Sequence, residues 1–146
     1  DMLEKIGFKT ELKILDGGVY FQTIGSEKTE NLHTGFANWF QDFPHPGNFM
    51  FLVNGKSIQP TNNQNFGNVN DPEINRLIDE ANREPELTDE AVEKYAQANR
   101  LLAEGFHVAP YGHRKLATFL SERMDFENCS LFHPVYQNDY SSFCLK

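Results

Sequence analysis

Residues 36–46 read Phe-Ala-Asn-Trp-Phe-Gln-Asp-Phe-Pro-His-Pro, an aromatic run that ends in two prolines. The short apolar and aromatic pattern of residues 34–39 is typical of a buried strand. Pro44 and Pro46 lack a backbone N–H and restrict the residues before them, so residues 42–47 cannot continue as a helix or a central strand. We therefore predict a strand that gives way to a shaped loop.

This strand end places an indole and a carboxylate close together. Trp39 and Asp42 are three residues apart, and ligands bind at strand ends in open α/β sheets. A Trp face and a carboxylate together suit a cationic amine, through contact with the ring and a charge-assisted hydrogen bond. In the alternative interpretation Trp39 belongs to the core and Asp42 only caps the loop. Both interpretations stay open on these residues alone.

The segments before this stretch favour one strand and one short helix. Residues 8–15 alternate between apolar and charged side chains, which predicts a half-buried strand. A Gly-Gly turn follows, and residues 19–24 are expected to form a helix closed by Gly25. The first residues have helical spacing and lead into Gly7, so we expect the chain to open with the last turns of a helix and to be part of a longer protein.

Two further helices are predicted downstream of an Asn-rich surface loop over residues 57–69, while residues 48–53 fit a short helix or a strand. Asn70 or Asp71 caps the first helix and Thr88 caps the second, which Gly105 ends. Their expected core faces are Ile74, Leu77, Ile78 and Ala81 in the first, and Val92, Tyr95, Ala96 and Leu102 in the second.

The C-terminal part favours two short strands, residues 106–110 and 116–120, followed by an irregular aromatic tail that should pack on the rest. Cys129 and Cys144 are the only cysteines. If the protein is exported, we expect a disulfide between them. Since strands and helices alternate along the chain, the sequence predicts an α/β fold.

Composition narrows the function. The 146 residues suit one domain, and the net charge of −8 disfavours a nucleic-acid-binding protein. No apolar stretch approaches the length of a membrane span. The five histidines never fall at the spacing that pairs metal ligands on a helix, and no nucleophile elbow or phosphate-binding glycine loop occurs. These observations predict neither an enzyme nor a metal or cofactor site.

Taken in order, these motifs resemble a known family. Three motifs occur in the order found in extracytoplasmic solute-binding proteins of family 5: Ile6-Gly7-Phe8, the Trp39-x-x-Asp42-aromatic-Pro-x-Pro loop with Asn48-Phe49, and the helix that begins at Asp71-Pro72. These are the oligopeptide- and dipeptide-binding subunits of ABC importers. The resemblance covers residues 1–120 and corresponds to the distal lobe and C-terminal part. It implies most of a periplasmic-binding-protein-like class II lobe, a mixed sheet flanked by helices, with residues 121–146 as a tail on the lobe.

The resemblance also implies a function and a site. The lobe would close with a second lobe of the same protein, here missing, over a peptide or other small solute and deliver it to a membrane permease. The protein would be extracytoplasmic and anchored to the membrane. Asp42 would pair with the amino group of the ligand, Trp39 would wall the pocket, and Asn38 would alter the shape of the pocket because it replaces a small residue.

Two other functions remain as alternatives. One is a structural or interaction domain that keeps the lobe fold without a solute, and a more distant one is a small zinc hydrolase. Because a clamp buries its ligand between two lobes, we expect these 146 residues alone to fold but to bind solute poorly.

Overall fold

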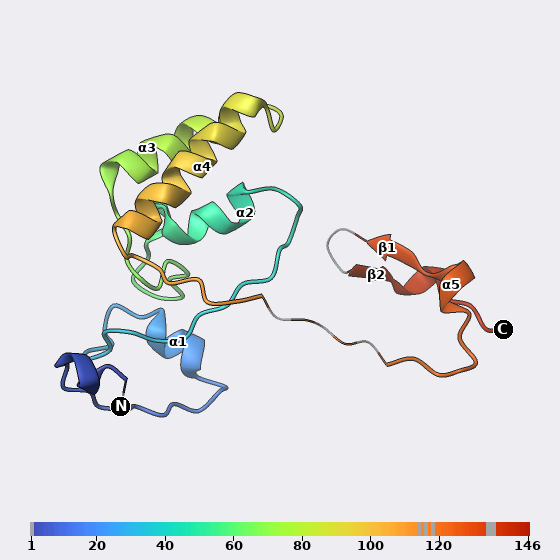
Figure 1. Ribbon diagram of the computed structural model, residues 1–146, viewed down its shortest axis with the longest axis horizontal. Helices are drawn as coiled ribbons and strands as arrows, with labels where there is room; N and C mark the ends of the chain where they lie inside the picture. Colours follow the sequence, from blue (N-terminus) through green and yellow to red (C-terminus); the bar gives the residue numbers. More distant parts are fainter. Residues whose placement is uncertain (1, 114, 116, 118, 134–136) are drawn as a thin grey trace.

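The computed structural model describes residues 2–113, 115, 117, 119–133 and 137–146. Helices and one small antiparallel sheet make up its regular structure (Figure 1). This mixture is compatible with the predicted α/β class, although the sheet has only two strands. The α-helices are α1 (Tyr20–Ile24), α2 (Gly47–Met50), α3 (Pro72–Ala81), α4 (Asp89–Glu104) and α5 (Phe126–Cys129); the strands are β1 (Leu131–His133) and β2 (Gln137–Asp139); and single 3-10 turns span Glu4–Ile6, Phe51–Val53, Gly55–Ser57 and Tyr140–Ser142.

Both long helices begin at the predicted caps. The carboxylate of Asp71 accepts hydrogen bonds from the backbone N–H groups of Glu73 and Ile74, at 2.8 and 3.0 Å. The hydroxyl of Thr88 accepts one from the N–H of Ala91 at 3.1 Å. These bonds satisfy N–H groups that have no partner inside the first helical turn. The two helices are therefore defined by local signals in the sequence, and Gly105 follows the end of α4 as expected.

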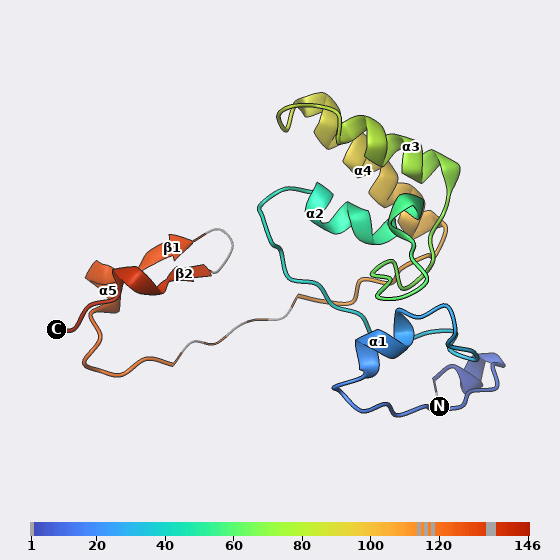
Figure 2. The ribbon, with the colours of Figure 1, turned by 180° about the vertical axis from the view of Figure 1, so that it is seen from behind.

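The core lies between α3 and α4, which run side by side in Figures 1 and 2. All four predicted core residues of α3 are buried. In α4, Tyr95 and Leu102 are buried as predicted, but Val92 is 45% exposed and Ala96 is also exposed. Ala91 and Ala98 take their places. The buried stripe at 91, 95, 98 and 102 keeps helical spacing, and its small alanines let the two helices approach closely.

The segment before α3 packs under this helix pair. Residues 48–53 are helical, as α2 and the following 3-10 turn, which decides between the two predicted alternatives. Val53 belongs to the same buried cluster as Val69, Ile74 and Ile78. Met50 packs against that cluster and also against the cluster around Tyr95. The helix pair thus supplies a fixed base for the loops on either side of α2.

Three predicted strands are not strands in the structure. Residues 8–15, 34–39 and 106–110 form no ladder with the described residues. Their apolar side chains are largely exposed, for example Leu12 at 86% and Phe106 at 91%. Alternating side chains make a strand only when a neighbouring strand supplies hydrogen bonds, and none of the described segments does so here. The predicted strand over residues 116–120 includes positions outside the described residues.

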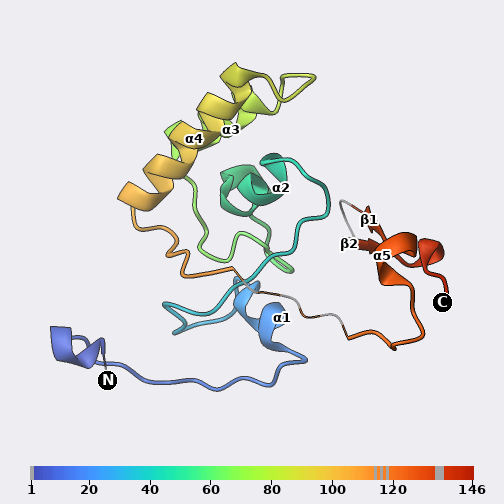
Figure 3. The same cartoon turned by 45° about the vertical axis from the view of Figure 1, so that its right-hand side comes forward.

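The described residues of the C-terminal segment, 121–133 and 137–146, are more regular than the sequence suggested. β1 pairs with β2 so that Leu131 lies opposite Asp139 and Phe132 opposite Asn138. A disulfide joins Cys129 at the end of α5 to Cys144, with 5.6 Å between their Cα atoms. In Figures 1 to 3 this segment lies apart from the α3–α4 pair. Its packing on the rest of the chain stays a prediction.

Candidate functional site

A cavity of about 390 Å³ that is open to solvent lies where three segments distant in sequence meet. Its volume is within the usual range of small-molecule sites. One side comes from α1, a second from the segment between α1 and α2, and a third from the Asn-rich loop before α3. The lining residues are Phe21, Gln22, Asn38, Trp39, Phe40, Asp42, Asn62, Asn63, Gln64 and Phe66. The three site residues predicted from the sequence, Asn38, Trp39 and Asp42, therefore lie on one cavity.

Buried asparagines hold the loop that forms the third side. Asn65 is fully buried, and its amide donates to the carbonyl oxygens of Asn54 and Val69 while it accepts from the N–H of Val69. The side-chain oxygen of Asn63 accepts from the N–H of Asn65 at 3.1 Å. These bonds satisfy backbone groups that a loop cannot pair by itself. The sequence predicted only a surface loop here, but these side chains give it a fixed shape.

The same loop is joined directly to the end of α1. The N–H of Asn63 donates to the carbonyl oxygen of Gly25 at 2.9 Å, and the N–H of Glu27 donates to that of Pro60 at 3.0 Å. A Cβ atom at Gly25 would lie 2.6 Å from the carbonyl oxygen of Asn63. Gly25 is thus needed because the loop backbone approaches it this closely. The two walls of the cavity carried by α1 and by the loop are held together at this point.

Asn48 holds Asp42 in place through two hydrogen bonds. The backbone N–H of Asp42 donates to Oδ1 of Asn48, and Nδ2 of Asn48 donates to Oδ2 of Asp42, each at 3.0 Å. Asn48 is 1% exposed and lies in the first turn of α2. Oδ1 of Asp42 forms no hydrogen bond with the described residues. One carboxylate oxygen is therefore fixed by the protein, and the other remains available at the cavity.

Trp39 is fixed by its ring rather than by its N–H group. Its indole packs edge-on against Phe51, with 5.2 Å between ring centroids. The indole Nε1 is buried and has no acceptor among the described residues. A buried donor without a partner costs about 1–3 kcal/mol. Packing against Phe51, in the 3-10 turn after α2, thus orients the indole as a wall of the cavity.

Four side-chain amides in the lining have no hydrogen-bond partner among the described residues. The side chains of Gln22, Asn38, Asn62 and Gln64 form no hydrogen bond with any residue that the structure describes. Each amide offers one acceptor and a two-hydrogen donor. Together with the free oxygen of Asp42, they give the cavity many polar groups that a ligand can satisfy. Asp42 is the single ionisable side chain in the lining.

An ion pair joins α3 to the 3-10 turn Gly55–Ser57, which follows α2. Lys56 Nζ lies 2.5 Å from Oδ2 of Asp79 in α3, and Asn54 Nδ2 donates to the other oxygen at 3.2 Å. The hydrogen bond from Lys56 is the main cause that lowers the pKa of Asp79, and the bond from Asn54 adds to it. These contacts stabilise the ionised carboxylate of Asp79, and all three residues lie outside the cavity lining.

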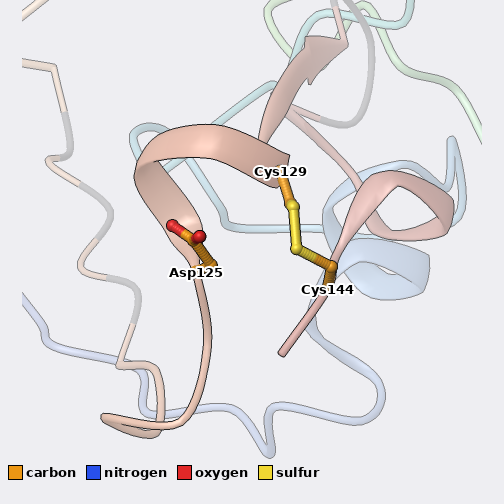
Figure 4. Close-up of side chains that lie close together, drawn as sticks. All are labelled: Asp125, Cys129 and Cys144. Atoms are coloured by element: carbon orange, nitrogen blue, oxygen red, sulfur yellow. A yellow bond between two sulfur atoms is a disulfide. The ribbon is translucent and has the colours of Figure 1, made fainter. Parts of the chain in front are cut away.

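The C-terminal segment holds the one group of metal-ligand atoms that the described residues bring together. The ligand atoms of Asp125, Cys129 and Cys144 lie within 4.8 Å of one another (Figure 4). Both sulfurs are joined in the disulfide and are not available as thiolates, the form that binds metals. The cluster therefore offers a metal only the carboxylate of Asp125.

Sequence reasoning identified one wall of the cavity and missed the other two. Phe21, Phe66, Asn62 and Gln64 were assigned to a helix and a surface loop without a role, because nothing local shows that these segments meet at Asp42. Asn48 was noted as part of the motif, but its contact with Asp42 was not foreseen. Its position six residues after Asp42 and just after two prolines was the available signal.

No protein family, curated protein or solved structure was found to match this chain. Among the described residues, no helix combines the length and the apolar character needed to cross a membrane.

Proposed function

We propose that this chain is the ligand-binding lobe of an extracytoplasmic solute-binding protein of an ABC importer, and that it captures peptides. The proposal includes the finer fold assignment, a periplasmic-binding-protein-like class II lobe that closes with a second lobe. It also includes the membrane permease as partner and the absence of catalytic activity. It is supported by the sequence motif around Trp39 and Asp42 and by the cavity that these residues line.

The observation that carries the proposal is the carboxylate of Asp42, of which only one oxygen is hydrogen-bonded to a described residue. Asn48 fixes one oxygen of Asp42, and the other faces no partner among the described residues. A carboxylate held in this way is pre-organised for a ligand, because it does not have to be ordered when the ligand binds. A primary ammonium group supplies the matching charge and donors, and such a charge-assisted bond is worth about 1.5–3 kcal/mol.

The rest of the lining suits a peptide next to that ammonium group. A peptide main chain carries both carbonyl acceptors and N–H donors, and the uncommitted amides of the cavity offer both complements. The aromatic walls can cover apolar side chains.

The test uses the protein as its natural source produces it, purified without denaturation. Native mass spectrometry identifies any solute that it carries, and thermal denaturation is then followed with Phe-Gly-Gly and with N-acetyl-Phe-Gly-Gly. Free peptide at about 100 times its dissociation constant should stabilise the protein by about 2.7 kcal/mol. We expect the peptide with a free amine to raise the Tm and the acetylated peptide to do so much less. No stabilisation by either peptide would favour the structural or interaction domain instead.

A further inference from the structure

We propose that the Trp39 cavity selects peptides whose first residue carries an aromatic or large aliphatic side chain. This inference rests on the proposed function, since it names the ligand of the same cavity. It adds a residue-level selectivity that binding of peptides in general does not require.

The apolar part of the cavity is an aromatic wall formed by Phe21 and Phe66. Their ring centroids lie 5.8 Å apart with the planes tilted by 35°, so the two rings form one continuous surface across α1 and the Asn-rich loop. Phe21 is 44% exposed although it lines the cavity. Large exposed aromatic surface is unfavourable in water and is stabilised when an apolar ligand group covers it.

This wall has a fixed position relative to Asp42. Tyr20 packs edge-on against Phe21, with ring centroids 5.2 Å apart, and its hydroxyl donates to the carbonyl oxygen of Phe36 at 2.7 Å. Phe36 begins the stretch that carries Trp39 and Asp42. On the opposite side, the loop that carries Phe66 is bonded to Gly25 through Asn63. The ammonium site and the aromatic wall therefore belong to one connected arrangement.

The charge of the lining disfavours a second anion. Asp42 is the one ionisable lining residue, and no lysine, arginine or histidine stands beside it in the lining. An acidic first side chain would bring a carboxylate close to Asp42 without a cation to compensate, which is unfavourable. A ligand with an ammonium group, neutral amides and an apolar side chain leaves none of these groups unmatched.

The experiment compares four peptides on the naturally produced protein by isothermal titration calorimetry: Phe-Gly-Gly, Leu-Gly-Gly, Gly-Gly-Gly and Glu-Gly-Gly. Burial of a large apolar side chain should make the Phe and Leu peptides bind about tenfold or more tightly than Gly-Gly-Gly. Glu-Gly-Gly should bind more weakly than Gly-Gly-Gly.

Variants locate the selectivity in the aromatic wall. Phe66→Ala should lower the ratio of the affinities for Phe-Gly-Gly and Gly-Gly-Gly toward one, and Phe66→Leu should lower it only in part. The milder variant keeps the test valid if Phe66→Ala does not fold. The matched control is Phe119→Ala, which removes a phenyl ring that is 93% exposed and outside the lining, and which should leave the ratio unchanged.

The outcomes separate this inference from the proposed function. If no peptide binds, the proposed function fails and the inference with it. If all four peptides bind with equal affinity, the proposed function stands and the selectivity is wrong. A strong preference that persists in both Phe66 variants would also overturn the assignment of the selectivity to this wall.

Discussion

The helical region, residues 47–105, and the extended flanks, residues 8–16 and 106–113, contain apolar side chains of the same kinds and place them differently. Every buried apolar side chain of the described residues lies between Val53 and Leu102. In the flanks, Leu12, Ile14 and Phe106 are 86%, 87% and 91% exposed. A helix completes its own backbone hydrogen bonds, whereas an extended segment needs a neighbour to do so. The flanks therefore have enough apolar side chains. What they lack is a pairing partner among the described residues.

The largest expected effect is in the core of the helical region. Ile78 is completely buried between α3 and α4, and Ile78→Ala should lower the free energy of unfolding by about 2–5 kcal/mol because it leaves a cavity. The matched change in a flank is Leu12→Ala, which should cost about 0.5 kcal/mol or less. Urea denaturation of both variants measures the contrast. A large loss for Leu12→Ala would show that this flank is packed in solution.

The next effect concerns the disulfide. A bridge across 15 residues stabilises a folded segment by about 3 kcal/mol, by restricting the unfolded chain. Reduction should therefore speed hydrogen exchange in residues 121–146 and leave α3 and α4 unaffected. Intact mass before and after alkylation shows whether the bond is present in protein purified without reductant. Two alkylatable thiols in that protein would contradict the structure.

A smaller effect should follow from removal of a helix cap. Asp71→Ala deletes the acceptor for two N–H groups at the start of α3 and should cost about 1 kcal/mol. Asp71→Asn should recover most of this loss, because an asparagine also caps. Thermal denaturation of the two variants is the measurement, and equal losses for both would argue that the charge of Asp71 matters more than the hydrogen bonds.

The smallest effect is a dependence on pH within the helical region. Because the pKa of Asp79 is lowered in the folded state, its ion pair with Lys56 adds stability above the ordinary pKa of 3.8, and this stability is lost as the pH falls through the lower folded value. Arg76 also lowers the pKa values of Glu73 and Glu80, so the comparison must be with Asp79→Asn. The variant should lose less stability than the native protein on acidification, as followed by urea denaturation. Identical pH profiles would rule out the contribution of Asp79.

The same contrast explains how much of the fold could be predicted. Asp71, Pro72 and the apolar spacing of α3 lie within one segment, so the sequence alone predicts that helix and its buried face. The predicted face of α4 was partly wrong because Val92 and Ala96 also have helical spacing and are at least as apolar as Ala91 and Ala98, so the pattern does not decide between two adjacent faces. Residues 8–15 have a clear alternating pattern, but the pattern cannot show whether a neighbouring strand is present.

The site combines a loop of the helical region, residues 62–66, with residues 21–22 and 38–42, which precede that region. Trp39 and Asp42 were predicted because a loop shaped by two prolines marks them in the sequence. The sequence could not predict the other lining residues, Phe21, Phe66 and Asn62. Their place on the cavity depends on the hydrogen bond between Asn63 and Gly25, which joins distant segments. Contacts between distant segments leave little trace in a single sequence, whereas a loop motif does.

The most direct measurement is the affinity of the naturally produced protein for Phe-Gly-Gly before and after Asp42→Asn. The change keeps an acceptor for Asn48 and removes the charge that would bind the amine. The binding free energy should therefore weaken by about 1.5–3 kcal/mol, which is a roughly 10- to 150-fold loss of affinity. The control is Glu104→Gln, an exposed carboxylate at the end of α4 and outside the cavity. A loss for Asp42→Asn alone, with an unchanged melting temperature, is the result we predict. Equal affinities for the native protein and Asp42→Asn would show that Asp42 is only a loop cap and would contradict the proposed site.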